Sequence, residues 1–259
     1  TLVGDNSNLP VTGHGGVTVT LSGGTQVTIN AGSATGSVTI NAPDDVYVGG
    51  QPTITKSITD ITVSGDKVFE KLVPSTTSVS TSVTDEPSGQ GDLVKVSIVA
   101  NQSSVNEATA PTFTVSLNKP LDKDLTVTLS NNDTVLFKAG ETSKVYTAPA
   151  QGDDVFKDPG TVTVGISKAE VPNATFEKLE FSNPASVSVT DTESKVTAVL
   201  SVDKSTVAEG GAITYTVTLV GDNSNLPVTG HGGVTVTLSG GTQVTINAGS
   251  ATGSVTINA

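Results

Sequence analysis

The sequence has no cysteine, methionine, tryptophan or arginine, and aromatic residues make up only 3% of its 259 residues. Without cysteine, no disulfide can stabilise the fold. Without arginine, and with a formal net charge of −12, the chain lacks the basic surface that holds phosphate groups. We therefore expect it to bind neither nucleic acid nor anionic membranes.

Long apolar runs are also absent. The sequence has no run of 18 apolar residues, so we expect no direct insertion into a membrane. Threonine, serine, valine and glycine are abundant instead, which suits half-buried strands. Apolar and polar residues alternate, as at residues 17–21 and 162–166, and glycine, proline, asparagine and aspartate interrupt these runs. No window shows a helical period, so the sequence predicts an all-β fold.

The chain is built from repeats. Residues 1–42 return without a change as residues 218–259, an offset of 217 residues. Between them the motif FEKL stands at residues 69–72 and again at residues 176–179. Other echoes are SVTD (82–85 and 188–191), DDV (44–46 and 153–155) and the similar stretches 103–117 and 205–219. Two related but unequal repeats therefore alternate, at a spacing of two sandwich-sized domains.

These repeats predict three domains. A complete short repeat occupies residues 91–194. Residues 195–259 are the opening part of a long repeat, and residues 1–90 are the C-terminal part of a long repeat whose first strands are missing. About seven strands in about 104 residues, with turn signals every 8–12 residues, predict tandem immunoglobulin-like β-sandwiches in a linear array.

Alternation in the short repeat predicts strands at residues 93–99, 111–117, 124–130, 134–138, 142–148, 160–166 and 174–190, the last interrupted at 182–184. In a seven-stranded antiparallel sandwich the chain enters at one pole and leaves at the other. The loops after the first, third and fifth strands therefore share one pole with the end of the last strand. Four carboxylates fall at that pole: Glu107, Asp153, Asp154 and Asp191.

The long repeat places four carboxylates equivalently, namely Glu209, Asp44, Asp45 and Asp85, with the glutamate in a different copy from the aspartates. Carboxylates without lysine or arginine partners repel one another, and a hard divalent cation removes that conflict. Calcium accepts carboxylate and backbone carbonyl oxygens, magnesium keeps several waters, and zinc lacks its cysteine and histidine ligands here. From the pattern alone, calcium ligands and solvated turn acids stay open as alternatives.

Catalysis finds little support in the sequence. The only histidines, His14 and His231, occupy one loop position in two copies of the run TGHGG, where we expect a solvated turn residue. Because the chain has no cysteine and each copy of this loop has a single histidine, neither a nucleophile–base pair nor a metal triad can be assembled. The neighbouring Asp44 and Asp45 would point to opposite faces of a strand, unlike the two acids of a glycosidase. The sequence therefore predicts no enzyme.

The ordered motifs SxVxEx, TFTVSLxxP, DDVF, FEKL and SVTDT, repeated along the whole chain, resemble the immunoglobulin-like extender repeats of giant calcium-dependent RTX adhesins. Gram-negative bacteria use these adhesins for biofilm attachment. The resemblance implies a secreted segment at the bacterial cell surface. Its repeats would bind Ca²⁺ at and near domain junctions and hold a distal ligand-binding module away from the cell.

The same resemblance implies Ca²⁺ ligands at Glu107, Asp153, Asp154, Asp191, Glu209, Asp44, Asp45 and Asp85. The partners of the chain would be neighbouring repeats, while other domains would bind the surface or glycan target. Two alternatives stay open. Exposed loops such as residues 13–16 could recognise a glycan, although the tyrosines that might stack on sugar, Tyr47, Tyr146 and Tyr215, lie within or beside apolar patterns. A Lys–Asn isopeptide bond could stabilise the domains in place of calcium.

Overall fold

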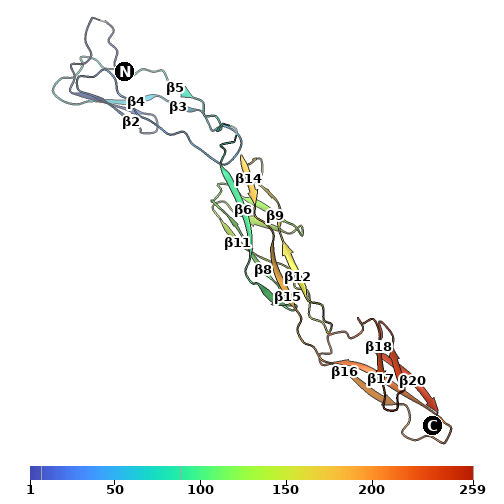
Figure 1. Cartoon of the computed structure of the whole chain (residues 1–259). Helices are drawn as coiled ribbons and strands as arrows, with labels where there is room; N and C mark the ends of the chain where they lie inside the picture. The colour runs from blue at the N-terminus through green and yellow to red at the C-terminus, as the bar shows by residue number, and fades with distance from the viewer. Residues whose placement is uncertain (7, 88, 259) are drawn as a thin grey trace. The chain divides into compact units, whose positions relative to one another are not determined.

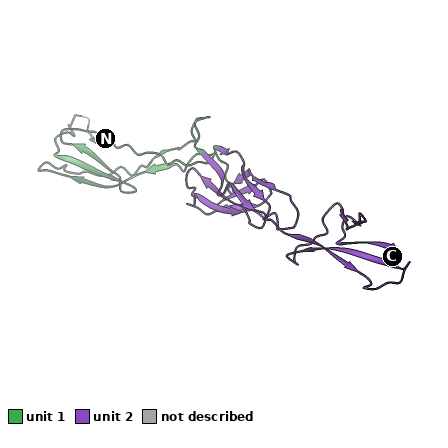
Figure 2. Ribbon diagram, turned by 60° about the horizontal axis from the view of Figure 1, so that its bottom comes forward, with its two compact units in different colours: residues 1–93, 174–178 green, residues 94–173, 179–259 purple. Residues whose placement is uncertain are grey.

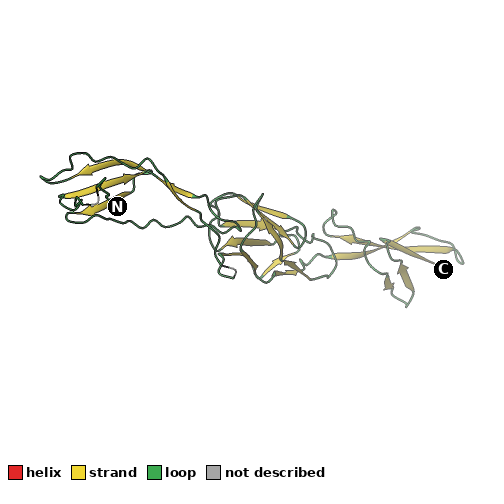
Figure 3. Cartoon of the chain, turned by 90° about the horizontal axis from the view of Figure 1, so that it is seen from above, coloured by secondary structure: helices red, strands yellow, loops and turns green. Residues whose placement is uncertain are grey.

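The computed structural model describes residues 1–6, 8–87 and 89–258 of the chain. Over these residues it consists of strands and loops only (Figure 3). The predicted all-β fold of immunoglobulin-like β-sandwiches is confirmed. None of the described segments is a helix with the length and apolar character needed to span a bilayer.

Two compact units make up the chain (Figure 2). The first contains Thr1–Leu93 and Ala174–Lys178, and the second contains Val94–Asn173 and Leu179–Ala259. By sequence, Ala174–Lys178 belongs to the short repeat and carries most of its FEKL motif. The first unit therefore combines residues of two successive repeats.

Ten strands form the short repeat (Figure 1): β6 (Leu93–Ala100), β7 (Ser104–Asn106), β8 (Thr112–Leu117), β9 (Leu125–Leu129), β10 (Thr134–Phe137), β11 (Ser143–Thr147), β12 (Gly160–Val164), β13 (Ile166–Glu170), β14 (Lys178–Phe181) and β15 (Ala185–Thr190). The sheet orders are β11-β8-β6-β14, β10-β9-β13 and β12-β15-β7. Alternate residues fill the core, as Phe113, Val115 and Leu117 do in β8. This period of two is the pattern from which the strands were predicted.

Two of these strands differ from the prediction. β7 lies where a loop was expected and runs parallel to β15, with Val105 opposite Val189; three residues are too few for alternation to show. β13 is a separate strand, because β12 pairs with β15 in one sheet while β13 pairs with β9 in another. The interruption predicted at 182–184 in the strand at 174–190 is confirmed, since it separates β14 from β15, and Pro184 there has no N–H to offer a ladder.

In the part of the first unit that the structure describes, five strands lie before the short repeat: β1 (Gly16–Leu21), β2 (Gln26–Asn30), β3 (Ile54–Lys56), β4 (Ile58–Val63) and β5 (Val79–Thr81). β1 is central in the order β2-β1-β4, and β3 pairs with β5. Val17, Val19 and Ile29 are buried, and Phe69 and Leu72 pack against them from the chain after β4. The FEKL motif of the long repeat is thus part of its core.

The expectation of a solvated His14 is wrong. Its side chain is only 5% exposed, and its Nε2 donates to the carbonyl oxygen of Ser33 at 2.8 Å. The imidazole lies 5.4 Å from the ring of Phe69, centroid to centroid. Because Gly16 is also buried, the loop at residues 13–16 contributes to the packing of its domain. Gly13 and Gly15 of this loop are exposed.

The last part of the second unit contains β16 (Val196–Val202), β17 (Ala212–Gly221), β18 (Val234–Thr237), β19 (Gln243–Ile246) and β20 (Thr252–Asn258). The sheet orders are β16-β17-β20 and β18-β19. Val217, Leu219, Val244 and Ile246 form its buried core. Every residue of β16 is exposed, unlike β6, which occupies the same place in the short repeat.

Candidate metal centre

Glu107 is the buried carboxylate of the short repeat. It follows β7 and its side chain is 0% exposed. Its backbone N–H donates to the carbonyl of Thr190, and its own carbonyl accepts the N–H of Gly152, each at 3.0 Å. Its Oε1 accepts the N–H of Thr192 at 3.0 Å. The other oxygen, Oε2, is buried and has no hydrogen-bond partner.

Those hydrogen bonds bring together the loop after β7, the loop between β11 and β12, and the end of β15. These are the segments that strand parity assigns to one pole. Carboxylate oxygens of Glu107, Asp158 and Asp191 lie within 4.8 Å of one another there. Asp191 Oδ1 also accepts the backbone N–H of Asp158 at 2.9 Å. Within the described residues, none of these three carboxylates pairs with a lysine.

The two other acids predicted for this site are placed differently. Asp154 Oδ1 accepts the N–H of Phe156 at 2.6 Å and so closes a local turn. Asp153 is half-buried, and its Oδ1 is a buried oxygen without a hydrogen-bond partner. Neither belongs to the three-carboxylate group. Asp153 directly follows Gly152, which binds the backbone of Glu107, so a second unsatisfied oxygen lies in the same loop cluster.

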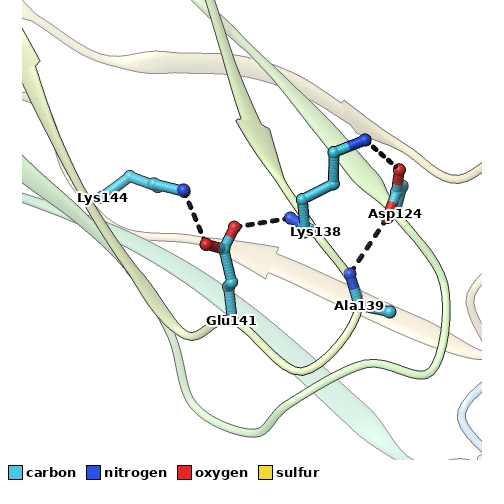
Figure 4. A network of polar contacts seen from close by, with 5 residues as sticks. All are labelled: Asp124, Lys138, Ala139, Glu141 and Lys144. Atoms are coloured by element: carbon cyan, nitrogen blue, oxygen red, sulfur yellow. Dashed lines mark hydrogen bonds and ion pairs between the residues drawn. The ribbon is translucent and has the colours of Figure 1, made fainter.

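Acids elsewhere in the short repeat do have cationic partners (Figure 4). Lys138 Nζ lies 2.7 Å from Asp124 Oδ2, and Lys144 Nζ lies 2.7 Å from Glu141 Oε1. Hydrogen bonds from Lys138 and from the N–H of Ala139 hold the pKa of Asp124 below its usual value. The shortage of partners at the pole is therefore local.

In the first unit a second acidic group forms a cleft of about 380 Å³. The acids that line it are Asp44, Asp45, Asp85, Glu86 and Glu177. Carboxylate oxygens of the last three lie within 4.8 Å of one another.

Hydrogen bonds hold two of these acids in place. Asp45 Oδ1 accepts the N–H of Tyr47 at 2.8 Å, the same turn that Asp154 makes in the short repeat. Asp85 Oδ2 accepts the N–H of Gly49 at 2.9 Å. Asp44 lines the cleft but is not in the tight group.

Glu177 is the titrating member of this group. The N–H of Asp92 donates to its Oε2 at 2.5 Å and lowers its pKa, but desolvation and the neighbouring Asp85 and Glu86 outweigh this, so the pKa of Glu177 is raised. The carboxylates therefore resist being charged together. That is a property a divalent cation would reverse.

Glu209, the eighth predicted residue, is exposed. It belongs to the second unit, whereas Asp44, Asp45 and Asp85 belong to the first. The sequence assigns them to different copies of the long repeat. Glu209 is exposed where its counterpart Glu107 is buried.

Three clustered acids were missed from the sequence, namely Asp158, Glu86 and Glu177. Strand parity was applied to acids that both repeats share. Gly49 stands in the long repeat where Asp158 stands in the short one, since each donates its N–H to the aspartate that ends the domain. Glu177 lies inside the repeated FEKL motif, a signal that could have identified it.

The LapA domain family model matches residues 8–86, 92–192 and 195–259. The chain belongs to the LapA domain family. LapA is a large biofilm adhesin of Pseudomonas, so the chain is a segment of biofilm-adhesin type, structural in character and associated with the cell surface or exterior.

No curated protein matches the LapA-type chain. Among solved structures, a mutant of Salmonella alpha-2-macroglobulin matches with 13% identity and a TM-score of 0.27. The alignment covers 96% of this chain and 19% of the macroglobulin. The chain therefore spans about a fifth of that protein's length, and the low similarity carries no functional argument.

Proposed function

We propose that this LapA-domain segment is an extender of a bacterial surface adhesin, stiffened by Ca²⁺ and holding a distal ligand-binding module away from the cell. The observation that supports calcium is the carboxylate of Glu107, fully buried with one oxygen unsatisfied and two further carboxylates within 4.8 Å. An unsatisfied buried polar atom costs about 1–3 kcal/mol, and more when charged.

The donor set fits calcium. All side-chain donors at the pole are carboxylate oxygens, the type that Ca²⁺ prefers, and no histidine or cysteine is among them. Glu107, Asp158 and Asp191 would hold the ion, and Asp153 would add the second unsatisfied oxygen of that loop cluster. The ion would supply positive charge where the repeat provides no lysine.

Binding at this pole would act on the end of the domain. Thr192, which donates to Glu107, is followed by only two residues before Lys195 opens the long repeat. An ion held by Asp191 and Glu107 would fix the last strand to the neighbouring loops, and so restrict the segment that leads to the next repeat. The acidic cleft of the first unit would serve the preceding repeat in the same way.

Glycan recognition by loop 13–16 receives no support, because His14 and Gly16 are buried in the packing of their own domain. Tyr47 is only 4% exposed, so it offers no face to a sugar. The extender function is therefore the better-supported proposal.

The test is calcium titration of the whole chain by isothermal calorimetry, with thermal melts in calcium and in EGTA. Glu107→Gln should lose one binding event and most of the calcium-dependent rise in melting temperature. Asp124→Asn, which removes an acid already paired with Lys138, is the matched control and should bind as the native chain does. Equal binding heats for all three proteins, or none for the native chain, would overturn the proposal.

A further inference from the structure

A short turn that ends in an aromatic residue occurs in both kinds of repeat, as DDVY in the long repeat and as DDVF in the short repeat. In the long repeat, Asp45 Oδ1 accepts the N–H of Tyr47 at 2.8 Å. In the short repeat, Asp154 Oδ1 accepts the N–H of Phe156 at 2.6 Å. The turn, called the DDV turn below, therefore holds an aromatic side chain in an equivalent place in the two repeats.

Tyr47 contacts the part of the short repeat that belongs to the first unit. Its side chain is 4% exposed, and its ring lies 5.5 Å from that of Phe176, centroid to centroid. The two residues also form an antiparallel β-bridge. Two backbone hydrogen bonds flank the rings: Val48 N–H to Thr175 O at 2.8 Å and Glu177 N–H to Val46 O at 3.1 Å. Such complete burial of an aromatic residue outside the strands indicates a packed contact surface.

This pairing is continuous with a strand of the short repeat. β14 begins at Lys178, directly after Glu177, and lies beside β6 in the sheet β11-β8-β6-β14. Residues 174–178 therefore lead into the sandwich of the short repeat, although they are compact with the first unit. The chain that forms β14 thus reaches back to the DDV turn of the long repeat.

Phe156 makes a corresponding contact within the second unit. Its side chain is half-buried and lies against Gly230, in the TGHGG loop of the long repeat that follows. A Cβ atom built at Gly230 would lie 2.7 Å from Phe156 Cε2, closer than real side chains approach. The ring therefore occupies space that is open only because residue 230 is glycine.

We infer that the aromatic residue of the DDV turn is the surface by which each repeat docks on the repeat that follows it. Tyr47 docks on Phe176 of the short repeat, and Phe156 docks on the backbone of Gly230 in the long repeat. The partner is in each case the next repeat of the same chain, and the docking surface is apolar.

Docking is independent of the calcium proposal, because carboxylates take no part in the ring contact or in the backbone bonds beside it. These contacts are made by ring carbons and by N–H and C=O groups that bond to one another. A calcium ion binds mainly to carboxylate and other oxygen ligands. Chelation should therefore leave the aromatic residues docked, and experiments in EGTA test docking alone.

Introduced thiols can test the first contact in the whole protein, because the chain has no cysteine. Opposed residues of an antiparallel pair have Cα atoms roughly 4.5–5.5 Å apart, within reach of a disulfide. Tyr47→Cys with Phe176→Cys should therefore close a disulfide within one chain under mild oxidation in EGTA. Tyr47→Cys with Phe181→Cys carries as many thiols, but position 181 is at the other end of β14, so this control should not close.

Hydrogen exchange at the N–H of Glu177 tests the ring itself. Tyr47→Ala should raise its exchange rate in EGTA by at least about 2- to 12-fold, the share of an aromatic pair beyond the burial of its area. Tyr47→Phe keeps a ring of the kind that Phe156 supplies in the short repeat and should exchange at the native rate. Val48→Ala, which truncates a neighbour that is 60% exposed, is the matched control.

Gly230→Ala tests the second contact, because the added methyl group must displace the Phe156 ring. Fluorophenylalanine at position 156 reports its surroundings in a fluorine NMR spectrum of the whole chain in EGTA. Gly230→Ala should shift that resonance. Gly13→Ala makes the same change in the identical loop, where an added Cβ meets no described atom within 4 Å, and should not shift it.

Three outcomes would each overturn docking. The first is a disulfide between positions 47 and 176 that closes no faster than the control. The second is a native exchange rate at Glu177 in the Tyr47→Ala chain. The third is an equal response of the fluorine resonance to Gly230→Ala and to Gly13→Ala.

Discussion

Glu107 brings burial, negative charge and an unsatisfied oxygen into one side chain. Its neighbours Asp158 and Asp191 carry the same charge, so the group is costly to fold without a cation. The calcium proposal therefore predicts more than lost binding when Glu107 is made neutral.

The Glu107→Gln chain should melt in EGTA at a temperature equal to or above that of the native chain, because the substitution removes a repulsive charge and retains the shape. In calcium it should melt below the native chain, since the ion has lost its buried ligand. Differential scanning calorimetry in the two buffers measures both shifts. A native-sized calcium response in this variant would place the ion at another site.

Glu177 predicts a pH dependence for the first unit. Its folded-state pKa lies above the ordinary value of 4.5, because desolvation, Asp85 and Glu86 outweigh the lowering effect of the Asp92 N–H. Deprotonation therefore weakens the folded state: the penalty is absent below the unfolded pKa and complete above the folded pKa. In EGTA, stability should rise as the pH falls through that window.

Hydrogen exchange of peptides from residues 43–93 can follow this effect, and Glu177→Gln should abolish it. Glu141 supplies a control of opposite sign. Hydrogen bonds from Lys144 and from the Lys138 N–H lower its pKa, so its contribution is lost as the pH falls. Exchange rates in the first unit that do not respond to Glu177→Gln would assign the pH dependence to another group.

Strands β6 and β16 occupy equivalent places in the two repeats, but their equivalent residues differ in burial. Ile98 is 3% exposed and Leu200 is 52% exposed. Truncating a buried isoleucine costs about 2–5 kcal/mol, so Ile98→Ala should strongly destabilise the short repeat. Leu200→Ala should cost about 1 kcal/mol or less in dilute solution.

Urea unfolding of the two variants measures this difference at equilibrium. Equal costs for Ile98→Ala and Leu200→Ala in dilute solution would contradict the burial of these strands.

Strand prediction succeeded where one face of a strand is buried. Phe113, Val115 and Leu117 alternate with threonine and serine, and β8 follows from that pattern alone. It failed at β7, where three residues pair in parallel with β15 and only Val105 is partly buried. A pairing made mainly by backbone groups leaves no periodic trace in the sequence.

The candidate site divides in the same way. Strand parity brought Glu107 and Asp191 to one pole, because loop order follows from strand count. Strand parity could not predict Asp158. The hydrogen bond from its backbone N–H to Asp191 depends on the conformation of one loop. Nor could parity reveal that Asp154 Oδ1 would accept the backbone N–H of Phe156.

At the scale of the whole molecule, calcium should set the stiffness of a repeat array. A ligand that binds only the folded form at about a thousand times its Kd adds about 4 kcal/mol, against about 5–15 kcal/mol for a typical domain. Chelation should therefore lower the melting temperature and shorten the persistence length of the array, while the circular dichroism spectrum remains that of a β-rich protein.

Small-angle scattering of a four-repeat array in calcium and in EGTA measures this change. Replacing Asp191 by Asn in one short repeat should loosen only the junction that follows it. Identical scattering profiles and melts in the two buffers would mean that the clustered acids bind no calcium that stiffens the array.

Because of the exact 42-residue repetition, two identical segments compete for the same partner strand during folding. In the order of the chain, Ile61 of β4 lies 42 residues from Val19 and 175 residues from the identical Val236. Closing the longer loop costs about 1 kcal/mol more in chain entropy, so the nearer partner is met first and more often. During folding, β4 would thus pair with the nearer of the two identical segments. The short repeat, which differs in sequence, separates the two identical segments along the chain. This separation reduces the chance that a strand pairs with the wrong copy.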